Sequence, residues 1–542
     1  MTERPDVGKV HAALAAVLAD HGVRTAFGVT GDGNMFIVDS FVREHGGRYV
    51  ATANEAGAVL MAMGYASASG GLGLATVTQG PGLANALGVL ISAARERLPV
   101  VVLTGDIAVR GHSQNIDQAL VVTPTGAAYE QARSAKTAPD DLVRALRRAL
   151  AERRPVVFAL PVGLNFADTD YTPGGKPELV RGQAVPPDPD ALDAAAGIIA
   201  SARRPIVLGG SGATSGTAPE ALRRLGDVLG APLATTLPAK GLFGYDKHDL
   251  GVFGSFSTPQ AVEAIMASDC VVAVGASLSR LTGGGEGWPY FQGKRIVHCD
   301  IDTRSIGGQY PADAPVVADA AAFAAAVTGL LDQAGYAGTG FRDSLAGGQA
   351  KAEASPAAGD EPVDPAEAMI TLNAVLPASR SVVTDGGRFV RHAVENLSVP
   401  SARHFAHAGR GFGAVGNGLP MAIGVGAALR DGPVVAVVGD GSFMLGGLAE
   451  FNTAVRHGID LIVVVCNDGA YGAEYRKLRG HGFDVATSLF DWPDFGPVAE
   501  SLGGSGFTVR TAADLARLGD VIAARGRPLL IDIKLDPATV PE

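Results

Sequence analysis

The chain has 542 residues, enough for about three domains of ordinary size, and a hydrophobic share of 47 % that can fill several cores. Its net charge of −11 argues against a nucleic-acid surface, which requires a basic patch. We expect no membrane span, because no run of about 18 apolar residues occurs, and no signal peptide, because the first residues lack an apolar stretch. The cysteines have no metal or redox spacing, so we predict buried, reduced thiols in a cytoplasmic protein.

Residues 1–185 alternate between short apolar runs and helical patterns. The runs indicate buried strands because Gly, Pro or polar residues bound them. We expect helices at 10–20, 40–45, 56–68, from the turn at 80–82 to 95, and at 142–153, and strands at 23–29, 49–53, 72–78, 99–104 and 155–160. Such alternation predicts a parallel sheet with helices on both faces.

A Pro- and Gly-rich segment at 169–190 reads as a linker to a second block. In this block we expect strands at 205–208, 270–274 and 295–299. The run Gly-Gly-Ser-Gly at 209–212 could cradle a phosphate, but we favour an ordinary connection from strand to helix. A flexible Ala-, Gly- and Ser-rich stretch at 336–362 precedes the third block. We therefore predict an α/β chain with three doubly wound parallel-sheet domains, at 1–185, 190–335 and 363–542.

The most informative stretch of the third block reads as one strand–helix–strand unit. An apolar run at 434–438 is followed by Gly439-Asp440-Gly441-Ser442 and by a helical pattern that extends to 457. A second apolar run at 461–466 is followed by Asn467-Asp468-Gly469. Since ligands bind beyond the carboxyl ends of the strands in open α/β sheets, both polar motifs are expected at one binding edge.

The chemistry that fits these motifs is a diphosphate held through Mg²⁺. Mg²⁺ prefers oxygen ligands, usually one or two carboxylates together with substrate phosphates. Asp440 offers a carboxylate, Asn467 an amide oxygen and Gly469 a backbone carbonyl. A helix that starts near Ser442 would direct free N–H groups toward a phosphate. A lone Gly-Asp-Gly is also ordinary turn chemistry, so the prediction depends on the spacing of the two motifs.

Glu55 lies where an expected strand passes into a helix, in the sequence NEAGAVLMAMGYA at 54–66. A glutamate at a helix start is favoured by the helix dipole alone. Together with the spacing from Asp440 to Asn467, however, this segment resembles the activating-glutamate motif of thiamine diphosphate (ThDP) enzymes of the acetolactate synthase-like and pyruvate decarboxylase-like family. The resemblance covers nearly the whole chain. It implies two outer domains that share a ThDP-binding fold and a Rossmann-like middle domain.

The resemblance also implies roles for individual residues. Glu55 would hydrogen-bond the aminopyrimidine and activate the cofactor, and Val415, in the segment 409–418, would prop the cofactor in a V shape. Gln79, in the turn after an expected strand, would contact the substrate. The residues expected to bind the diphosphate and Mg²⁺ are Gly439, Asp440, Gly441, Ser442, Asn467 and Gly469, of which Asp440, Asn467 and Gly469 would be the metal ligands.

Three further residues bear on the type of reaction. Asp32, in Gly-Val-Thr-Gly-Asp-Gly-Asn, resembles a catalytic aspartate of pyruvate decarboxylases. His112 lies near the place where decarboxylases carry two histidines, although only one is present here. Glu474 follows the Asn-Asp-Gly element, as a decarboxylase glutamate does, at an interval one residue longer. Such groups would serve as general acids or bases.

The pattern of acetolactate synthases is also incomplete. Their Phe-Gln-Glu element in the first domain is missing, and the nearest stretch, 114–118, reads Gln-Asn-Ile-Asp-Gln. The middle-domain segment 250–255 departs from the pattern common in FAD-containing synthases. FAD is therefore compatible with the family resemblance but is not supported by these residues.

We predict a ThDP- and Mg²⁺-dependent enzyme that decarboxylates a 2-oxo acid without oxidation and joins the resulting enamine to a carbonyl acceptor, as acetolactate synthase-like enzymes do. The alternative is a simple decarboxylase that releases an aldehyde. A flavin-linked oxidase of the same fold and a non-catalytic cofactor-binding subunit stay open as other classes. The resemblance further implies a homodimer or homotetramer, with each active site between the N-terminal domain of one subunit and the C-terminal domain of another.

Overall fold

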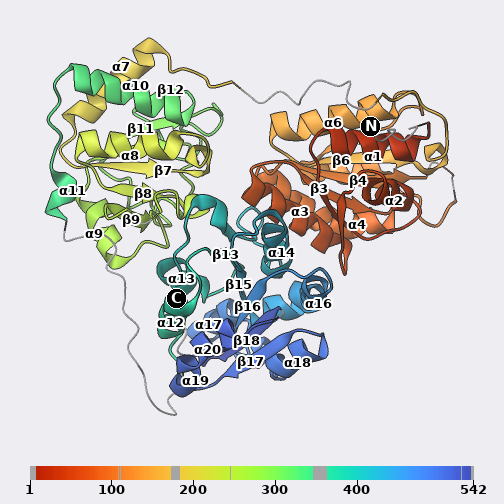
Figure 1. Cartoon of the computed structure of the whole chain (residues 1–542). Coiled ribbons are helices and arrows are strands. Elements are labelled where there is room, and N and C mark those ends of the chain that lie inside the picture. Colours follow the sequence, from red (N-terminus) through yellow and green to blue (C-terminus); the bar gives the residue numbers. More distant parts are fainter. Residues whose placement is uncertain are drawn as a thin grey trace.

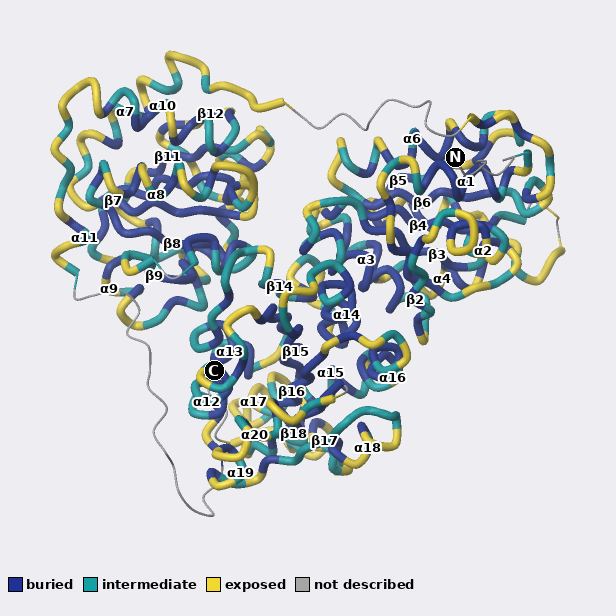
Figure 2. The backbone as a smooth tube through the Cα atoms, viewed as in Figure 1, coloured by how far each residue is buried: buried dark blue, intermediate teal, exposed yellow. Residues whose placement is uncertain are grey.

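The computed structural model describes residues 8–107, 109, 111–172, 183–244, 246–345, 363–526 and 528–538. Three six-stranded parallel sheets, each covered by helices, form three lobes (Figure 1). The buried residues concentrate in the sheets and on the helix faces that cover them (Figure 2). The predicted α/β class with three parallel-sheet domains is therefore confirmed.

The N-terminal sheet has the strand order β2-β1-β3-β4-β6-β5. Its strands are β1 (Thr25–Gly28), β2 (Arg48–Ala51), β3 (Gly73–Val77), β4 (Val100–Asp106), β5 (Ala128–Gln131) and β6 (Val156–Pro161). The helices are α1 (Val10–Asp20), α2 (Met35–Arg43), α3 (Glu55–Ser69), α4 (Pro81–Arg95), α5 (Gln118–Val122) and α6 (Ala138–Glu152). Each element expected in this block is present, whereas α5 and β5 were not predicted because they are short and follow a polar segment.

The middle sheet has the order β12-β11-β10-β7-β8-β9, which is the 3-2-1-4-5-6 order of Rossmann folds and confirms that prediction. Its strands are β7 (Pro205–Gly209), β8 (Leu233–Thr235), β9 (Asp249–Val252), β10 (Cys270–Val274), β11 (Arg295–Asp300) and β12 (Ala314–Val317). The helices are α7 (Pro189–Ser201), α8 (Ala218–Leu229), α9 (Pro259–Ala267), α10 (Ala320–Gln333) and α11 (Phe341–Ser344).

The C-terminal sheet has the order β14-β13-β15-β16-β18-β17. Its strands are β13 (Ser381–Thr384), β14 (Phe405–His407), β15 (Val434–Gly439), β16 (Leu461–Asn467), β17 (Ser505–Val509) and β18 (Leu529–Lys534). The helices are α12 (Pro365–Val375), α13 (Val390–Asn396), α14 (Gly418–Ala428), α15 (Asp440–Ser442), α16 (Leu448–Arg456), α17 (Gly472–Gly480), α18 (Phe495–Ser501), α19 (Ala512–Ala516) and α20 (Leu518–Ala523). Numbered within its own domain, this order is 2-1-3-4-6-5, as in the N-terminal sheet, so the two outer domains are alike as predicted.

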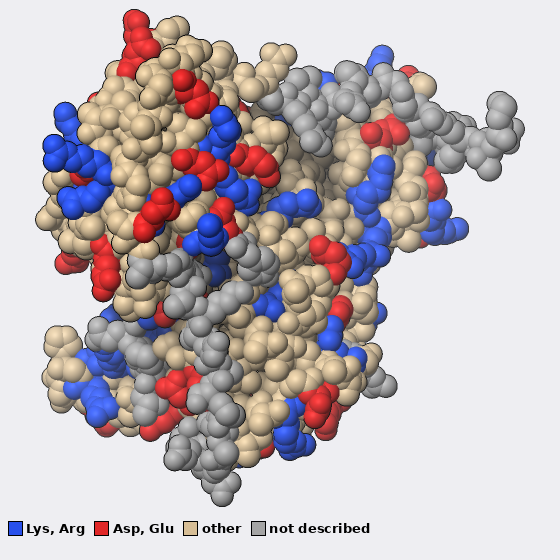
Figure 3. All heavy atoms as spheres, turned by 60° about the vertical axis from the view of Figure 1, so that its left-hand side comes forward, with Lys and Arg blue, Asp and Glu red and all other residues tan. Residues whose placement is uncertain are grey.

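The parts expected to be linkers fall mainly on residues 173–182 and 346–362, which lie outside the described residues. Within the second stretch, however, α11 forms a short helix and Phe341 is buried, so this part of 336–362 is folded and is not the flexible stretch that we expected. All three cysteines are buried and unpaired, as predicted. No helix in the described part of the chain is long and apolar enough to cross a bilayer. On the face shown in Figure 3, basic and acidic side chains intermix.

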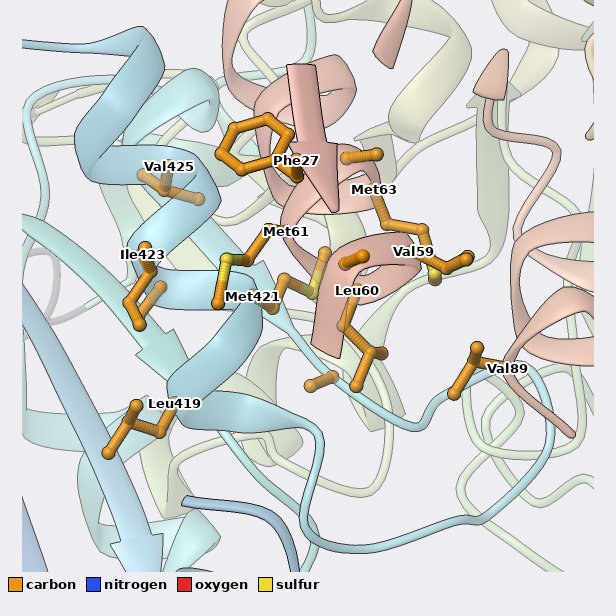
Figure 4. Close-up of a cluster of buried hydrophobic side chains, with 14 of the residues drawn as sticks. Phe27, Val59, Leu60, Met61, Met63, Val89, Leu419, Met421, Ile423 and Val425 are labelled. Atoms are coloured by element: carbon orange, nitrogen blue, oxygen red, sulfur yellow. The ribbon is translucent and has the colours of Figure 1, made fainter. Parts of the chain in front are cut away.

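The outer domains pack together through α3 and α14. Their buried side chains belong to one hydrophobic cluster, in which Met61 and Met421 face each other (Figure 4). The helices cross at two glycines. A Cβ on Gly64 would lie 2.1 Å from the carbonyl oxygen of Met421, and one on Gly424 would lie 1.9 Å from that of Met61. Only glycine therefore permits this close approach.

We expect Gly424→Ala to lower the free energy of unfolding by about 2–3 kcal/mol, because the methyl group would overlap the backbone of α3. Gly329→Ala in α10 is a matched control, since nothing lies within 4 Å of its added Cβ, and it should stabilise the protein by roughly 0.5–1 kcal/mol. Urea unfolding of both variants measures the difference. Equal midpoints for the two variants would show that the crossing tolerates a side chain.

Candidate active site

Asp440 lies at the carboxyl end of β15, beside the point where the strand order of the C-terminal sheet reverses. Only 2 % of it is exposed. Its Oδ1 accepts a hydrogen bond from the N–H of Gly441 at 2.7 Å, while its buried Oδ2 has no hydrogen-bond partner. Burial, and then the charge of Asp468, raise the pKa of Asp440 to about 7. A buried carboxylate oxygen without a partner is costly and fits a cation ligand.

Asn467, at the end of the neighbouring strand β16, is held by a residue that the sequence patterns did not single out. Its Nδ2 donates to Oδ1 of Asp532 at 2.9 Å, which turns its amide oxygen away from that carboxylate. Asp532 is fully buried and also accepts from the N–H of Phe495 and pairs with Lys534 at 2.9 Å. Asp532 therefore fixes which atom of Asn467 is free to bind a metal.

Gly469 adopts a left-handed conformation, with φ +62°, and its carbonyl accepts from the N–H of Phe490 at 2.8 Å. One lone pair of that oxygen is left for a metal. Among the described residues no group of three or more His, Cys, Asp or Glu could hold a metal ion. A set of one carboxylate, one amide and one carbonyl is thus incomplete by itself, as expected where phosphates supply further Mg²⁺ ligands.

An aromatic wall formed by Tyr471, Phe490 and Trp492 encloses this site. Consecutive ring centroids lie 4.5 and 4.9 Å apart. A Cβ on Gly441 would lie 2.7 Å from the ring of Tyr471, so the wall touches the backbone of the Gly-Asp-Gly turn. The indole N–H of Trp492 faces Asp440 closely enough to oppose part of the rise in the pKa of that carboxyl. It does not meet hydrogen-bond geometry, however, and is buried without a partner. Phe490 and Trp492 are partly buried, so they lower the polarity next to Asp440, where electrostatic interactions are stronger than in water.

The raised pKa of Asp440 predicts that Mg²⁺ binds more weakly as pH falls. The folded-state value of about 7 lies above the ordinary 3.8. Between these values the folded protein retains a proton that the unfolded chain releases, so the metal-free protein loses stability as pH rises through this window. If Asp440 ligates Mg²⁺ as predicted, the ion must displace this proton, and its affinity should fall about tenfold per pH unit below pH 7. Calorimetric titration with Mg²⁺ and ThDP at pH 6, 7 and 8 measures this, and constant affinity would contradict it.

Val415 lies in a loop that a second buried carboxylate positions. Oδ2 of Asp385, which follows β13, accepts from the N–H groups of Gly416 at 3.0 Å and Gly418 at 2.8 Å. Burial raises the pKa of Asp385 to about 6, although these backbone donors oppose the rise. Val415 itself is 45 % exposed and Leu445 is 65 % exposed. A Cβ on Gly416 would lie 3.3 Å from the Cβ of Leu445, so these two exposed apolar side chains lie close together, which suits the packing role predicted for Val415.

Glu55 begins α3, after a short turn at 52–54 that follows the carboxyl end of β2. Its Oε2 accepts from Nδ2 of Asn85 in α4 at 3.1 Å. A Cβ on Gly82 would lie 3.5 Å from its Oε1, so the turn at 80–82 borders the same carboxylate. Asn54 caps α3 by accepting from the N–H of Gly57 at 2.7 Å, which fixes the start of the helix. Glu55 is thus only partly buried and carries one polar partner on the protein side.

Asp32, Gln79 and His112 follow the carboxyl ends of β1, β3 and β4, three adjacent strands next to β2. The structure therefore brings these residues to the same sheet edge as Glu55. Asp32 and His112 are exposed. Gln79 is buried and donates to Oε1 of Gln114 at 2.7 Å, and the N–H of Gln114 donates to Nδ1 of His112 at 3.2 Å. The catalytic roles of all three stay predictions.

Glu474 is exposed on α17, a helix without buried residues that follows Gly469. Its predicted role in proton transfer also stays a prediction. The sequence patterns missed Asn85, Asp385, Glu450, Trp492 and Asp532, which hold or enclose the predicted residues. An Asp-Gly-Gly turn at 385–387 after an apolar run was the one local signal available for any of them.

The glycine-rich turn of the middle domain is confirmed as an ordinary connection. The N–H of Gly210 donates to the carbonyl of Val274, and that of Gly212 to the carbonyl of Gly275, both at 2.9 Å. A Cβ on Gly210 would lie 2.1 Å from the carbonyl oxygen of Gly275. These glycines permit two loops to touch, and their N–H groups are already satisfied by protein carbonyls.

Comparison with known proteins identifies this arrangement. Three family models match the chain: the N-terminal TPP binding domain of thiamine pyrophosphate enzymes at residues 8–124, their central domain at 192–327 and their C-terminal TPP binding domain at 385–533. The chain belongs to the thiamine pyrophosphate enzyme family. Thiamine pyrophosphate is another name for ThDP, so the two like outer domains of the chain are the ThDP-binding domains of this family.

Relatives within the family cover almost the whole chain. The acetolactate synthase large subunit of Haemophilus influenzae is 27 % identical over 537 residues, which are 96 % of this chain and 93 % of that protein. An acetolactate synthase of Mycobacterium bovis is 29 % identical over 551 residues, with 96 % and 87 % covered. The solved structure of a ThDP-dependent 4-hydroxybenzoylformate decarboxylase from Rhodococcus jostii has a TM-score of 0.82 at 21 % identity and covers 97 % of this chain and 99 % of that one. The last comparison shows the shared fold.

Proposed function

We propose that this family member is a ThDP- and Mg²⁺-dependent enzyme that decarboxylates a 2-oxo acid without oxidation and joins the remaining fragment to a carbonyl acceptor. The observation that carries the proposal is the buried, unpartnered carboxylate oxygen of Asp440 beside Asn467, at the edge of a ThDP-binding domain. The two acetolactate synthases support the choice of a carboligation reaction. Shared fold alone does not determine a reaction, which is why substrate tests decide it.

In this proposal each part of the chain has a defined task. Asp440, Asn467 and the carbonyl of Gly469 would hold Mg²⁺, and the helix that begins at Asp440 would direct N–H groups toward the diphosphate. Bound ThDP supplies the nucleophilic carbon and accepts the electrons released when CO₂ leaves. Glu55 would share a proton with the aminopyrimidine, and Val415 would hold the cofactor in shape by packing.

Contacts within the single chain support an active site that a second copy completes. The loop before Val415 touches the C-terminal end of α4, where Nε of Arg410 lies 3.1 Å from Oε2 of Glu96. Glu55 instead touches Asn85, near the start of α4. At 1.5 Å per residue these ends of α4 are roughly 15 Å apart. One chain therefore presents two half-sites, and we propose a homodimer or homotetramer that joins Glu55 of one copy to Asp440 of another.

The second candidate is a decarboxylase that releases the aldehyde. The placement of Asp32 and His112 at the same sheet edge as Glu55 favours it, because both are exposed and able to exchange protons. A proton delivered by either group would compete with the carbonyl acceptor. The two reactions therefore differ in what the fragment left after decarboxylation reacts with, a proton or a carbonyl acceptor.

Incubation with Mg²⁺, ThDP and a panel of 2-oxo acids, with and without carbonyl acceptors, tests the proposal by NMR. Acyloin or acetohydroxy acid products are expected. Free aldehyde as the sole product would show that the protein is a simple decarboxylase and does not catalyse carboligation. A yellow protein that reduces an acceptor would indicate the flavin-linked oxidase instead, and no consumption of any acid would contradict both candidate reactions.

A further inference from the structure

One helical segment runs from the diphosphate site to the activating glutamate. It comprises α15 (Asp440–Ser442), the π-helical turn η6 (Phe443–Gly447) and α16 (Leu448–Arg456), without a break. Its first residue is the predicted metal ligand. The side chains of its last turns contact the segment at 51–54 of the N-terminal domain, directly before Glu55. The same helix thus reaches both outer domains.

Glu450, in α16, makes the central contact. Its carboxylate accepts from the N–H of Ala53 at 3.2 and 3.1 Å and from the N–H of Asn54 at 3.2 Å. The side chain is fully buried, and burial raises the pKa of its carboxyl despite these donors. A Cβ on Gly57 would lie 2.1 Å from its Oε1, so only a glycine fits beneath the carboxylate. Hydrogen bonds to a charged group are stronger than hydrogen bonds between neutral groups. The last of these donors, the N–H of Asn54, belongs to the residue directly before Glu55.

Two residues at the end of the same helix also bind the backbone of the segment at 51–54. Nη2 of Arg456 donates to the carbonyl of Ala51 at 2.8 Å, and Nε2 of His457 accepts from the N–H of Ala51 at 3.1 Å. The polar backbone groups of Ala51 and the N–H groups of Ala53 and Asn54 are therefore all paired with one helix. We call Glu450, Arg456 and His457 the α16 clamp.

We propose that the α16 clamp couples occupancy of the diphosphate site to the position of Glu55, with Glu450 as the positioning residue. This rests on the proposed function. A π-helical turn is rare and is frequent at functional sites, and η6 lies between Asp440 and Glu450. An ion bound at Asp440 would fix the start of the helix, and the clamp would pass that constraint to the backbone of Glu55. In the proposed dimer those two residues serve different active sites, so the clamp would connect the two sites.

Hydrogen exchange with Mg²⁺ and inorganic pyrophosphate tests the coupling, because this probe can fill the diphosphate site but cannot reach Glu55. In the wild-type protein the probe should slow exchange of the amides at 51–57 about tenfold. In Glu450→Ala the same amides should change less than about twofold, although the probe still binds. Glu500→Ala, an exposed glutamate in α18, is the matched control and should behave as wild type.

Turnover distinguishes positioning from general stability. Glu450→Ala should lower kcat about tenfold or more while the Kd for ThDP changes less than about threefold. Glu450→Gln retains one acceptor oxygen and should recover part of kcat. It also serves if the alanine variant does not fold. Equal losses of ThDP affinity and kcat in the glutamine variant would show that Glu450 merely supports the fold.

Mixed dimers, purified by two different tags, show which active site the clamp serves. If Glu450 acts on Glu55 of its own chain, a dimer with Glu450→Ala on one chain and Glu55→Gln on the other should have two impaired sites. A dimer with both substitutions on one chain should keep about half of the activity, because its second site is intact. The reverse pattern would overturn the proposal.

Pyrophosphate that binds to the wild-type protein but protects only the residues around 439–443 and 467–469 would also overturn the coupling, and the diphosphate site would stand. Failure of pyrophosphate and ThDP to bind at all would overturn the coupling and the proposed function together. The exchange rates of the metal-free variants still report the clamp in that case, since loss of Glu450 should expose the amides of Ala53 and Asn54.

Discussion

Glu55→Gln should lower turnover by a factor of about 10²–10⁴, the usual contribution of a positioned acid or base, while Mg²⁺ and ThDP still bind. Glutamine keeps the size of the side chain and an oxygen that can accept from Asn85, which now donates at 3.1 Å. It cannot share a proton with the aminopyrimidine. The loss of turnover would therefore come from impaired proton transfer at the cofactor, because the structure at the start of α3 is retained.

Glu44→Gln is a suitable control, because Glu44 is exposed at the end of α2 and belongs to the same domain. Steady-state kinetics on the substrate identified by NMR, together with calorimetric ThDP binding, separates turnover from affinity. Unchanged turnover in Glu55→Gln would refute the proposed mechanism. A large loss of ThDP affinity would instead assign Glu55 a role in binding.

Asp440→Asn should abolish Mg²⁺-dependent ThDP binding and at the same time stabilise the metal-free protein at pH 8. The first effect follows because an amide is a much poorer ligand for Mg²⁺ than a carboxylate. The second follows because the metal-free site buries an ionised carboxylate whose Oδ2 has no partner. Removing such a charge should raise the free energy of unfolding by roughly 1–3 kcal/mol.

The opposite signs of these two effects make the experiment specific. Asp520→Asn, an exposed residue of α20, should change neither quantity. Calorimetry measures ThDP affinity, and urea unfolding at pH 8 and pH 5 measures stability. The gain in stability should shrink at pH 5, because Asp440, with a pKa of about 7, is then already protonated in the folded protein. Retained Mg²⁺-dependent ThDP affinity would place the metal elsewhere.

Local sequence signals were sufficient for the repeating units of the fold. Apolar runs bounded by Gly, Pro or polar residues marked most strands of the N-terminal sheet and half of those of the middle sheet. In the C-terminal sheet the runs at 434–438 and 461–466 match β15 and β16 closely, whereas the other strands of that sheet, including the buried β18, were not predicted. Short elements such as β5, β8 and β12 were missed, because three or four residues carry little periodicity. The predicted helix at 443–457 is present, but its π-helical turn was not foreseen, because the i to i+5 bonding of that turn depends on packing and not on composition.

Some residues of the candidate site could likewise be predicted from local sequence, whereas others could be found only in the structure. Asp440 directly follows β15, Asn467 ends β16 and Glu55 comes shortly after β2, so their spacing to nearby apolar runs revealed them. Asp532 lies 65 residues from the Asn467 that it orients, and Glu450 lies 397 residues from the Ala53 that it holds. No local pattern can indicate a partner at that distance, because the first contact exists only after β16 and β18 have paired in one sheet and the second only after two domains have packed together.

The sequence by itself therefore determined the class of fold, the likeness of the outer domains through their family resemblance, and the chemical groups offered to a diphosphate and a metal. Those properties follow from backbone periodicity and from residue types within a few positions of each other. Tertiary structure decided which oxygen of Asn467 is free, why Gly64 and Gly424 must be glycine, and that α16 grips the segment before Glu55. Each of these depends on backbones brought within a few ångströms by packing between distant parts of the chain, and packing of that kind leaves no periodic trace in the sequence.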